Sequence, residues 1–300
     1  MLAAGIIGTL VLAGCQTSGF GTVRPGTLAV VAAELQYGNV ASQIGGRYVS
    51  VSSVERNPNT DPHNYEASPQ VAAAVSSAQV VIENGLGYDA FMSKLITATP
   101  SPHRVAIDVA TLLHLPTTTQ NPHLWYAPST MPAVARVLAA TFSKLDPIHR
   151  SYFTSNADRF IHSLEAWQQA IDALHTAFPH AAVATTEPVA DALLQAAHID
   201  NLTPFQFQAD VMNGIDPSPQ AVSIESSLIR RHRVQALVYN QQVSDALTKS
   251  FITLAQASHV PIVGVYETMP TPGYDYQQWM LAETHALTRA FATHQSTTRL

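Results

Sequence analysis

The sequence predicts an α/β protein of two lobes, each with a central, mainly parallel sheet flanked by helices, joined by one long rigid helix. Three observations lead to this fold class. A chain of 300 residues is long enough for two compact cores. Short apolar runs alternate with amphipathic stretches, which is typical of βαβ units. A central segment of about thirty residues holds no glycine, which favours a continuous helix.

Residues 28–145 are expected to form the first lobe. Strands are predicted at LAVVAA (28–33), YVSVSSV (48–54), AQVVIEN (78–84) and RVAID (104–108), because each is a short apolar run bounded by polar residues. Helices are predicted at SPQVAAAVSS, at YDAFMSKLIT and after Pro132. Strands separated by helices imply parallel neighbours in the sheet.

Residues 146–178 are expected to be the joining helix. Asp146 and Pro147 form a typical N-cap and first-turn pair. Apolar residues then recur at helical spacing, at Phe153, Phe160, Leu164, Trp167, Ile171 and Leu174. One helix of this length would span roughly 45 Å. The alternative is two shorter helices inside a single domain.

Residues 179–300 are expected to form the second lobe, with strands at AAVATT (181–186), VQALVYN (234–240) and VPIVGVY (260–266). A weak internal repeat relates the lobes. In both, Ser-Pro-Gln opens a helix, and an apolar strand that ends at asparagine follows. Facing lobes of this kind bind a ligand between the carboxyl ends of their sheets.

The N-terminal run MLAAGIIGTLVLAGC (1–15) resembles a bacterial lipoprotein signal peptide, with Cys15 as the lipidated residue after processing. No Lys or Arg precedes the apolar run, which departs from the usual pattern. The alternative is a buried N-terminal helix, since the run is too short to span a bilayer. Residues 16–27 (QTSGFGTVRPGT) are expected to be a flexible tether. The single cysteine excludes an intramolecular disulfide and a multi-cysteine metal site.

In two segments, DPHNYE (61–66) and NPHLWY (121–126), a histidine follows a proline and an aromatic residue comes soon after. Proline disfavours a helix interior, so both histidines are expected in loops with a stiff backbone. His63 and His123 then form a metal-binding pair or are two unrelated turn residues, and these residues alone leave both possibilities open. Tyr65 and Trp125 either line such a site or pack in a core.

Several motifs in order match one known family. DPHNYEASPQ, AQVVIENGLGYDAFM, NPHLWYAP, LDPIHRSYFTSNADRFIHSLE, TTEPVADALL, MNGIDPSPQ and YETMPTPGYDYQQWM resemble the metal-binding solute-binding proteins of ABC transporters that import zinc or manganese. The resemblance covers residues 28 to about 287. It implies two α/β lobes, one long linking helix and a single divalent ion in the cleft between the lobes.

The resemblance also implies the ligands. The histidine of the DPH motif corresponds to His63, and the second family histidine corresponds to His123, with Asn121 replacing the usual aspartate before the proline. The third position is Glu187 in TTEPVA, where zinc-preferring members often carry histidine and manganese-preferring members glutamate. The fourth is Glu267 in VYETMP, where aspartate is common.

Two imidazoles and two carboxylates would neutralise a divalent cation and suit Zn²⁺ or Mn²⁺, with Fe²⁺ as a third candidate. An enzyme is not expected, because four protein ligands leave no position for a substrate and the chain has no HExxH, GxSxG, P-loop or GxGxxG motif. Glu34, at the end of the first strand, is expected either to support this site or to cap the strand.

The resulting expectation is a monomeric, extracytoplasmic receptor, lipid-anchored at Cys15, that captures the metal and delivers it to an ABC permease. The alternative is a surface adhesion lipoprotein of the same fold. Nucleic acid is not an expected partner, because the formal net charge is -6 and only 12% of residues are charged.

Overall fold

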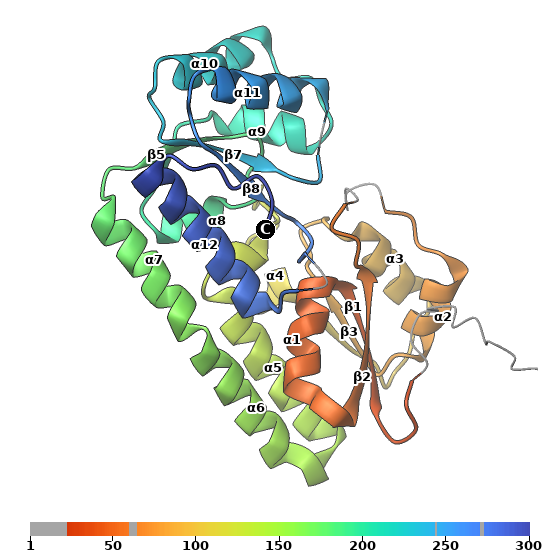
Figure 1. Ribbon diagram of the computed structural model, residues 1–300. Helices are drawn as coiled ribbons and strands as arrows, with labels where there is room; N and C mark the ends of the chain where they lie inside the picture. Colours follow the sequence, from red (N-terminus) through yellow and green to blue (C-terminus); the bar gives the residue numbers. More distant parts are fainter. Residues whose placement is uncertain (1–22, 60–64, 244, 271–272) are drawn as a thin grey trace, which may run out of the picture.

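The computed structural model describes residues 23–59, 65–243, 245–270 and 273–300, so Cys15 and His63 lie outside the described residues. Two four-stranded sheets make up the framework, with strand orders β2-β1-β3-β4 and β6-β5-β7-β8 (Figure 1). Every strand pair in them is parallel. The predicted fold class is confirmed, and both sheets have the same topology.

The strands of the first sheet are β1 (Leu28–Glu34), β2 (Val49–Glu55), β3 (Val80–Glu83) and β4 (Val105–Asp108). Those of the second are β5 (Ala182–Thr185), β6 (Asp200–Asn201), β7 (Ala236–Asn240) and β8 (Ile262–Val265). Seven of these lie where apolar runs predicted them. The two-residue strand β6 has no apolar run and was not predicted.

The helices fall into three groups along the chain. Those of the first lobe are α1 (Leu35–Gly45), α2 (Pro69–Ser77), α3 (Ala90–Ala98), α4 (Val109–Leu112) and α5 (Thr130–Leu145), with the 3₁₀ helices η1 (Gly46–Tyr48) and η3 (Leu124–Tyr126). The joining segment holds η4 (Pro147–His149), α6 (Arg150–Ser163) and α7 (Glu165–Ala177). The rest are α8 (Asp191–Ala196), α9 (Phe205–Met212), α10 (Pro219–Arg230), α11 (Ala246–Ala257) and α12 (Tyr276–Thr293).

Helices α6 and α7 run as one long rod along the molecule (Figure 1). Only Leu164 separates them, and its backbone stays in the right-handed helical region at φ -80° and ψ -9°. The expectation of one long joining helix is therefore confirmed. Asp146 and Pro147 form the predicted N-cap and first-turn pair, but they begin the short 3₁₀ helix η4 that precedes α6, and Asp146 is also the C-cap of α5.

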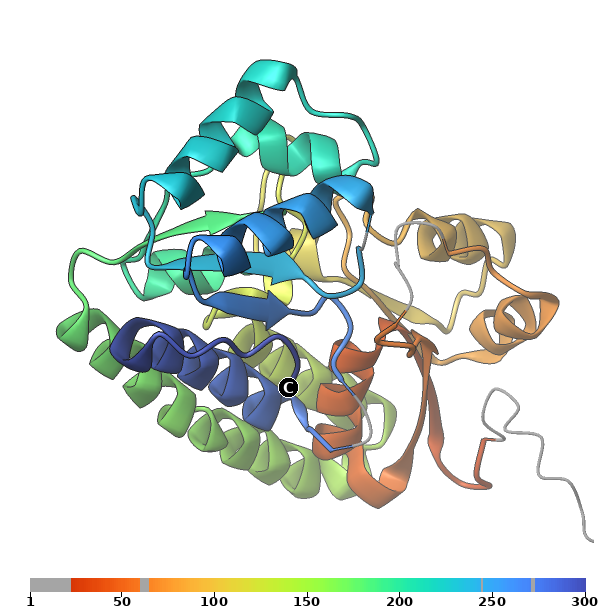
Figure 2. The same ribbon diagram turned by 45° about the horizontal axis from the view of Figure 1, so that its top comes forward.

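One hydrophobic core is shared by both sheets. It contains Val30 of β1, Val183 of β5, Leu138 of α5, Trp167 of α7 and Trp279 of α12 in a single cluster. The outer faces of the sheets have smaller separate cores, under α2 and α3 in the first lobe and under α9, α10 and α11 in the second. Figure 2 shows α12 lying beside the rod, so the inner layer of helices holds the two lobes together.

The internal repeat is visible in the structure. Ser68 caps α2 by accepting a hydrogen bond from the Val71 backbone N–H, and Ser218 caps α10 in the same way. Each of these helices leads into a strand, β3 or β7, at whose carboxyl end an asparagine lies. These residues, Asn84 and Asn240, are buried and both contribute to the site described below.

Five of the thirteen histidines lie at the ends of helices. Their φ angles are between 51° and 54°, the left-handed conformation in which a helix terminates. After α8, for example, the His198 N–H donates to the Gln195 carbonyl and the Ile199 N–H to the Leu194 carbonyl, a Schellman motif. The five are His114, His198, His232, His259 and His294.

Candidate metal centre

Three of the four expected ligands lie at the carboxyl ends of the sheets, on the side where the two lobes face each other. His123 immediately precedes η3 in the first lobe. Glu187 follows β5, and Glu267 follows β8, in the second lobe. Their exposed fractions are 1%, 3% and 0%, so all three are buried. The fourth, His63, lies outside the described residues.

The hydrogen bonds of Asn121 determine which ring nitrogen of His123 is available. The Asn121 Nδ2 donates to the Pro188 carbonyl at 2.7 Å, so its Oδ1 is the atom that faces His123. That oxygen accepts from the His123 backbone N–H at 3.0 Å and lies 2.8 Å from Nδ1. Nδ1 therefore carries a proton, and Nε2 is the ring nitrogen directed at the interlobe space. An aspartate at position 121 has no hydrogen to donate to Pro188.

The Nε2 atom of His123 faces a carboxylate of the other lobe. His123 Nε2 is 3.2 Å from Glu267 Oε2. Two electron-pair donors at this distance repel each other unless a proton or a cation lies between them. The geometry is compatible with a shared proton or with a cation bound by both groups.

Asn240 connects the two glutamates. Its Oδ1 accepts from the Gln242 N–H at 3.0 Å, which turns Nδ2 toward the carboxylates. Nδ2 donates to Glu267 Oε1 at 2.6 Å and to Glu187 Oε2 at 3.1 Å. One amide group thereby holds two buried acidic side chains side by side.

The backbone and side chain of Glu267 are held from both lobes. The Gln242 Oε1 accepts from the Glu267 backbone N–H at 2.6 Å, and the first-lobe Gln36 Nε2 donates to its carbonyl at 3.2 Å. The Tyr88 hydroxyl donates to Glu267 Oε2 at 2.9 Å. Burial and then the Glu267 charge raise the pKa of Tyr88 well above its usual value, so this phenol stays a neutral donor.

The donor set fits a divalent transition metal, because it combines an imidazole nitrogen with carboxylate oxygens. In the described residues, no three His, Cys, Asp or Glu side chains already stand close enough to hold an ion together. What is present is the His123–Glu267 pair with Glu187 tied beside it by Asn240. The coordination shell is therefore only partly assembled within the described residues.

Two aromatic residues from the sequence analysis have different surroundings. Trp125 is buried, with its ring centroid 5.5 Å from that of His123 and 5.2 Å from that of Tyr88, so it both packs and lines the site. Tyr65 instead packs against Phe91 at 4.8 Å, on the outer face of the first sheet.

Five supporting residues were missed from the sequence: Asn240, Tyr88 and Asn84, together with Gln36 and Gln242. The Asn84 Nδ2 donates to the Pro122 carbonyl at 2.9 Å and so fixes the turn that carries His123. A signal for both asparagines exists, because the repeat places each of them at the end of an apolar strand. Tyr88 has no such signal.

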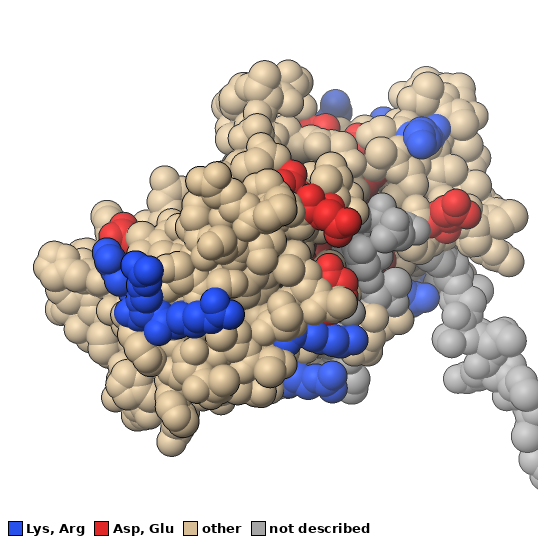
Figure 3. Space-filling view, turned by 90° about the horizontal axis from the view of Figure 1, so that it is seen from above, with Lys and Arg blue, Asp and Glu red and all other residues tan. Residues whose placement is uncertain are grey.

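On the face shown in Figure 3, Asp and Glu (red) and Lys and Arg (blue) are few and scattered among other residues, in keeping with a chain in which 12% of residues are charged. The formal net charge of -6 favours cations over anions without directing them to one region.

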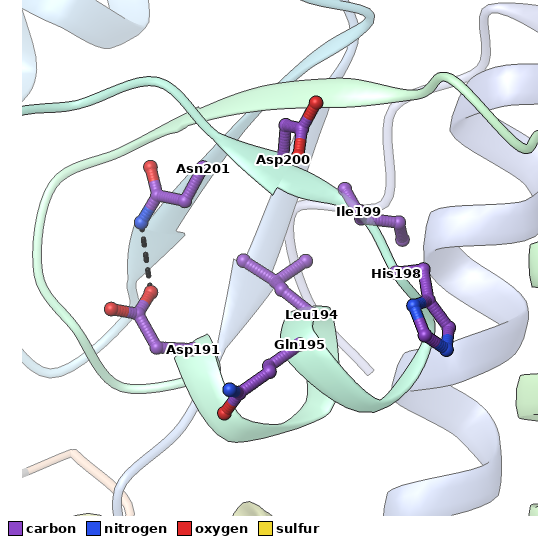
Figure 4. Close-up of a pocket in the computed structure, with 7 residues that line it drawn as sticks. All are labelled: Asp191, Leu194, Gln195, His198, Ile199, Asp200 and Asn201. Carbon is purple, nitrogen blue, oxygen red and sulfur yellow. Dashed lines mark hydrogen bonds between the residues drawn. The ribbon is translucent and has the colours of Figure 1, made fainter.

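A separate hollow of about 440 Å³ lies at α8 and β6 and includes no ligand residue (Figure 4). At its edge, the Asn201 Nδ2 donates to Asp191 Oδ1 at 2.8 Å. Burial raises the pKa of Asp191 to about 6, because the single amide only partly offsets the loss of water. Its residues brace the carboxyl end of β5 rather than add donors to the site.

Two parallel-sheet lobes on a helical rod, with imidazole and carboxylate groups meeting between them, define the class of metal-binding solute-binding proteins. The chain belongs to the family described as zinc-uptake complex component A, periplasmic, whose model matches residues 30–290. Members of this family are binding components of metal transporters.

Among relatives in sequence, the chain is similar to the manganese-binding lipoprotein MntA of Bacillus subtilis (strain 168), at 29% identity over 55% of this chain and 56% of that protein. The chain thus spans little more than half the length of that relative. It is also 22% identical to the metal ABC transporter substrate-binding lipoprotein SloC of Streptococcus mutans, over 78% of this chain and 79% of that one.

Solved structures share the fold. The periplasmic zinc-binding protein TroA from Treponema pallidum superposes with a TM-score of 0.73 at 16% identity, covering 90% of this chain and 100% of that one. FpvC from Pseudomonas aeruginosa, in complex with Mn²⁺, also gives 0.73, at 20% identity over 88% and 98% of the two chains. At these identities, the likeness establishes the fold alone.

Proposed function

We propose that this protein captures a divalent transition metal, zinc or manganese, and delivers it to the permease of an ABC transporter. One observation carries the proposal: a first-lobe imidazole nitrogen lies 3.2 Å from a second-lobe carboxylate oxygen, with a second carboxylate tied alongside. The proposed ligands are His63, His123, Glu187 and Glu267. The ion is the cargo, held between the lobes.

The choice of metal follows from the donors. Two carboxylates and two imidazoles suit Mn²⁺ slightly better than a set with three imidazoles would, because carboxylate oxygen is the harder donor. The same ligands still bind Zn²⁺ more tightly in a test tube by the Irving–Williams order. Affinity measured in vitro therefore has to be read together with the metal that is bound in the cell.

We further propose an extracytoplasmic, monomeric protein with a lipid anchor on Cys15, a tether at 16–27 and lobes at 28–145 and 179–300 joined by 146–178. The lipoprotein names of relatives support this location. In the described residues, no helix combines the length and hydropathy needed to cross a bilayer. We propose no enzymatic activity, since a closed shell of four protein ligands leaves no position for a reacting water.

The test is metal analysis of protein purified without chelator, followed by competition titrations of Zn²⁺ and Mn²⁺ against a coloured chelator. We expect about one bound ion per chain and a large loss of affinity in His123→Ala. His162→Ala is the matched control, because this histidine is on the rod with 77% of its side chain exposed. Equal affinities in wild type and His123→Ala would refute the site.

The same titrations at several pH values test the ligand type. Protons compete with the metal for imidazole, whose ordinary pKa is about 6.5, so the affinity should fall between pH 7.5 and 5. An affinity that stayed constant over this range would contradict histidine ligation.

Adhesion, the alternative from the sequence, has no observation in its favour among the described residues or the relatives named above. A double variant, His123→Ala with Glu267→Ala, separates the two functions. Loss of metal uptake by cells that carry it supports transport, whereas adherence that survives without metal binding would support adhesion.

A further inference from the structure

Glu283 of α12 lies at the end of a hydrogen-bond chain that reaches both ligand-bearing segments. Its Oε2 is 2.7 Å from the Tyr126 hydroxyl, and its Oε1 accepts from Trp279 Nε1 at 2.6 Å. The Tyr126 hydroxyl is also 2.8 Å from the Tyr266 carbonyl and 3.2 Å from the Tyr266 backbone nitrogen. Tyr126 is three residues after His123, and Tyr266 immediately precedes Glu267.

Counting hydrogens determines the state of this chain. A phenol has one hydrogen, so Tyr126 cannot donate to both the Tyr266 carbonyl and Glu283. If Glu283 is a neutral acid, its Oε2–H donates to Tyr126, and the phenol hydrogen goes to the Tyr266 carbonyl. Burial raises the pKa of Glu283 to about 8, which agrees with a neutral acid at pH 7. Every polar atom in the chain then has a partner.

We propose that Glu283 is a positioning residue for metal capture: through Tyr126 it fixes the His123 segment of the first lobe against the Tyr266–Glu267 segment of the second. This inference rests on the proposed metal-binding function. Glu283 itself is not a ligand.

The position of this hydrogen-bond chain makes the role specific. The distance between His123 Nε2 and Glu267 Oε2 depends on two segments that are 140 residues apart in sequence and meet at Tyr126. Metal ligands must be held to within about 0.5 Å of the geometry that the ion requires. Tyr276 provides a second hydrogen bond from α12 to the His123 segment, because its hydroxyl donates to the Trp125 carbonyl at 2.6 Å.

The neighbouring residue on α12 provides a matched control. Thr284 is fully buried like Glu283 and accepts a hydrogen bond from a tryptophan, Trp167 of the rod, at 3.0 Å. It contacts neither ligand-bearing segment through a hydrogen bond that the structure shows. Removing its hydroxyl should therefore reduce stability without moving the ligands.

The experiment compares four variants for Zn²⁺ and Mn²⁺ affinity and for thermal unfolding without metal. Glu283→Gln keeps one donor and one acceptor and should bind within about threefold of wild type, as a neutral acid predicts. Glu283→Leu and Tyr126→Phe break the chain and should weaken both metals about 10- to 100-fold, as loss of a ligand-orienting partner does. Thr284→Val should unfold at a lower temperature with unchanged affinity.

Wild-type affinity in Glu283→Leu or Tyr126→Phe overturns the inference, and so does a loss in Thr284→Val as large as theirs. Weak binding by Glu283→Gln would also overturn it, because the neutral-acid chain would then be wrong. If Glu283→Leu does not fold, the metal affinity of Tyr126→Phe still tests the inference. If wild type binds no metal, or His123→Ala binds like wild type, the proposed function fails instead, so the two failures are distinguishable.

Discussion

The two sheets have the same strand order, yet equivalent glutamates in them have opposite environments. Glu34 and Glu187 occupy matching positions, as do Asn84 and Asn240. All four lie four residues beyond register partners, which are Val30 with Val80 in the first sheet and Val183 with Ala236 in the second. Each sheet therefore has a glutamate and an asparagine at equivalent positions beyond the carboxyl ends of its two central strands.

In the second lobe, the two equivalent residues bond to each other, because the Asn240 amide donates to Glu187. In the first lobe, Asn84 turns its amide to the Pro122 carbonyl instead, and the oxygens of Glu34 accept no hydrogen bond in the structure. Burial, then Asp89 and then Glu55, raise the pKa of Glu34 well above its usual value. The comparison teaches that the buried glutamate proposed as a ligand accepts from a neighbouring amide, whereas the equivalent Glu34 does not.

The largest expected effect is a difference in metal affinity between variants of Glu187 and Glu34. Glu187→Gln replaces a proposed carboxylate ligand by an amide and should weaken metal binding about 1,000-fold, or roughly 4 kcal/mol. Glu34→Gln changes a buried carboxyl outside the proposed ligand set, whose pKa burial raises well above its usual value, and should bind within about threefold of wild type. Competition titration with both metals measures the difference, and similar losses in the two variants would contradict the comparison.

A second prediction uses Glu225, a buried acid of the second lobe that accepts from the Thr203 hydroxyl at 2.9 Å. Burial raises its pKa from 4.5 to about 8. The folded chain holds this proton more tightly than the unfolded chain, so the stabilisation is fully present below about pH 4.5 and is lost as the pH rises through about 8.

Glutamine cannot titrate, so Glu225→Gln should remove this dependence. Between pH 5 and pH 7.5, the free energy of unfolding of metal-free wild type should fall by about 3 kcal/mol more than that of the variant. Urea unfolding at the two pH values measures this, and parallel curves for the two proteins would show that Glu225 is ionised when folded.

A third prediction tests Asn240, whose amide donates to two glutamates, whereas the equivalent Asn84 donates to a backbone carbonyl. Asn240→Ala leaves Glu187 and Glu267 without their shared donor and should weaken metal binding about 10- to 100-fold, the usual cost of losing a ligand-orienting group. Asn156→Ala, which removes a buried amide of the rod that donates to the Ile44 carbonyl at 2.9 Å, is the control. The comparison would have to be revised if both variants bound metal like wild type.

The smallest effect concerns the histidines that end helices in both lobes. His259 has a φ of 54°, a conformation in which a Cβ is unfavourable. His259→Gly should raise the free energy of unfolding by about 0.5–1 kcal/mol, and His259→Ala should not. Neither should change metal affinity. Denaturant titration distinguishes the two substitutions.

Most of the fold was predictable because apolar runs and helix signals are local. Seven strands and the rod follow from such patterns, whereas β6 is two residues long and pairs only because β5 lies beside it. The thirteen histidines are a weak guide to the site, because five of them occupy left-handed positions at helix ends, where histidine is more common than most residues.

The site was predictable only in part. The family resemblance named His123, Glu187 and Glu267, and the structure brings these three to one region, while His63 remains a prediction. The groups that hold them depend on contacts between distant parts of the chain. Glu283, for instance, lies 157 residues from its partner Tyr126, and no local pattern indicates such a pair.

The core that both sheets share has a consequence for the metal binding that we propose. Swinging the lobes apart would expose apolar surface on the rod and on α12, at a cost that grows with the area uncovered. Exchange is therefore expected through local displacement of the segments at the strand ends, which opens at far lower free energy than the whole fold. The residence time of the metal then depends on a few hydrogen bonds, and a partner that displaces one segment can trigger release while both lobes stay folded.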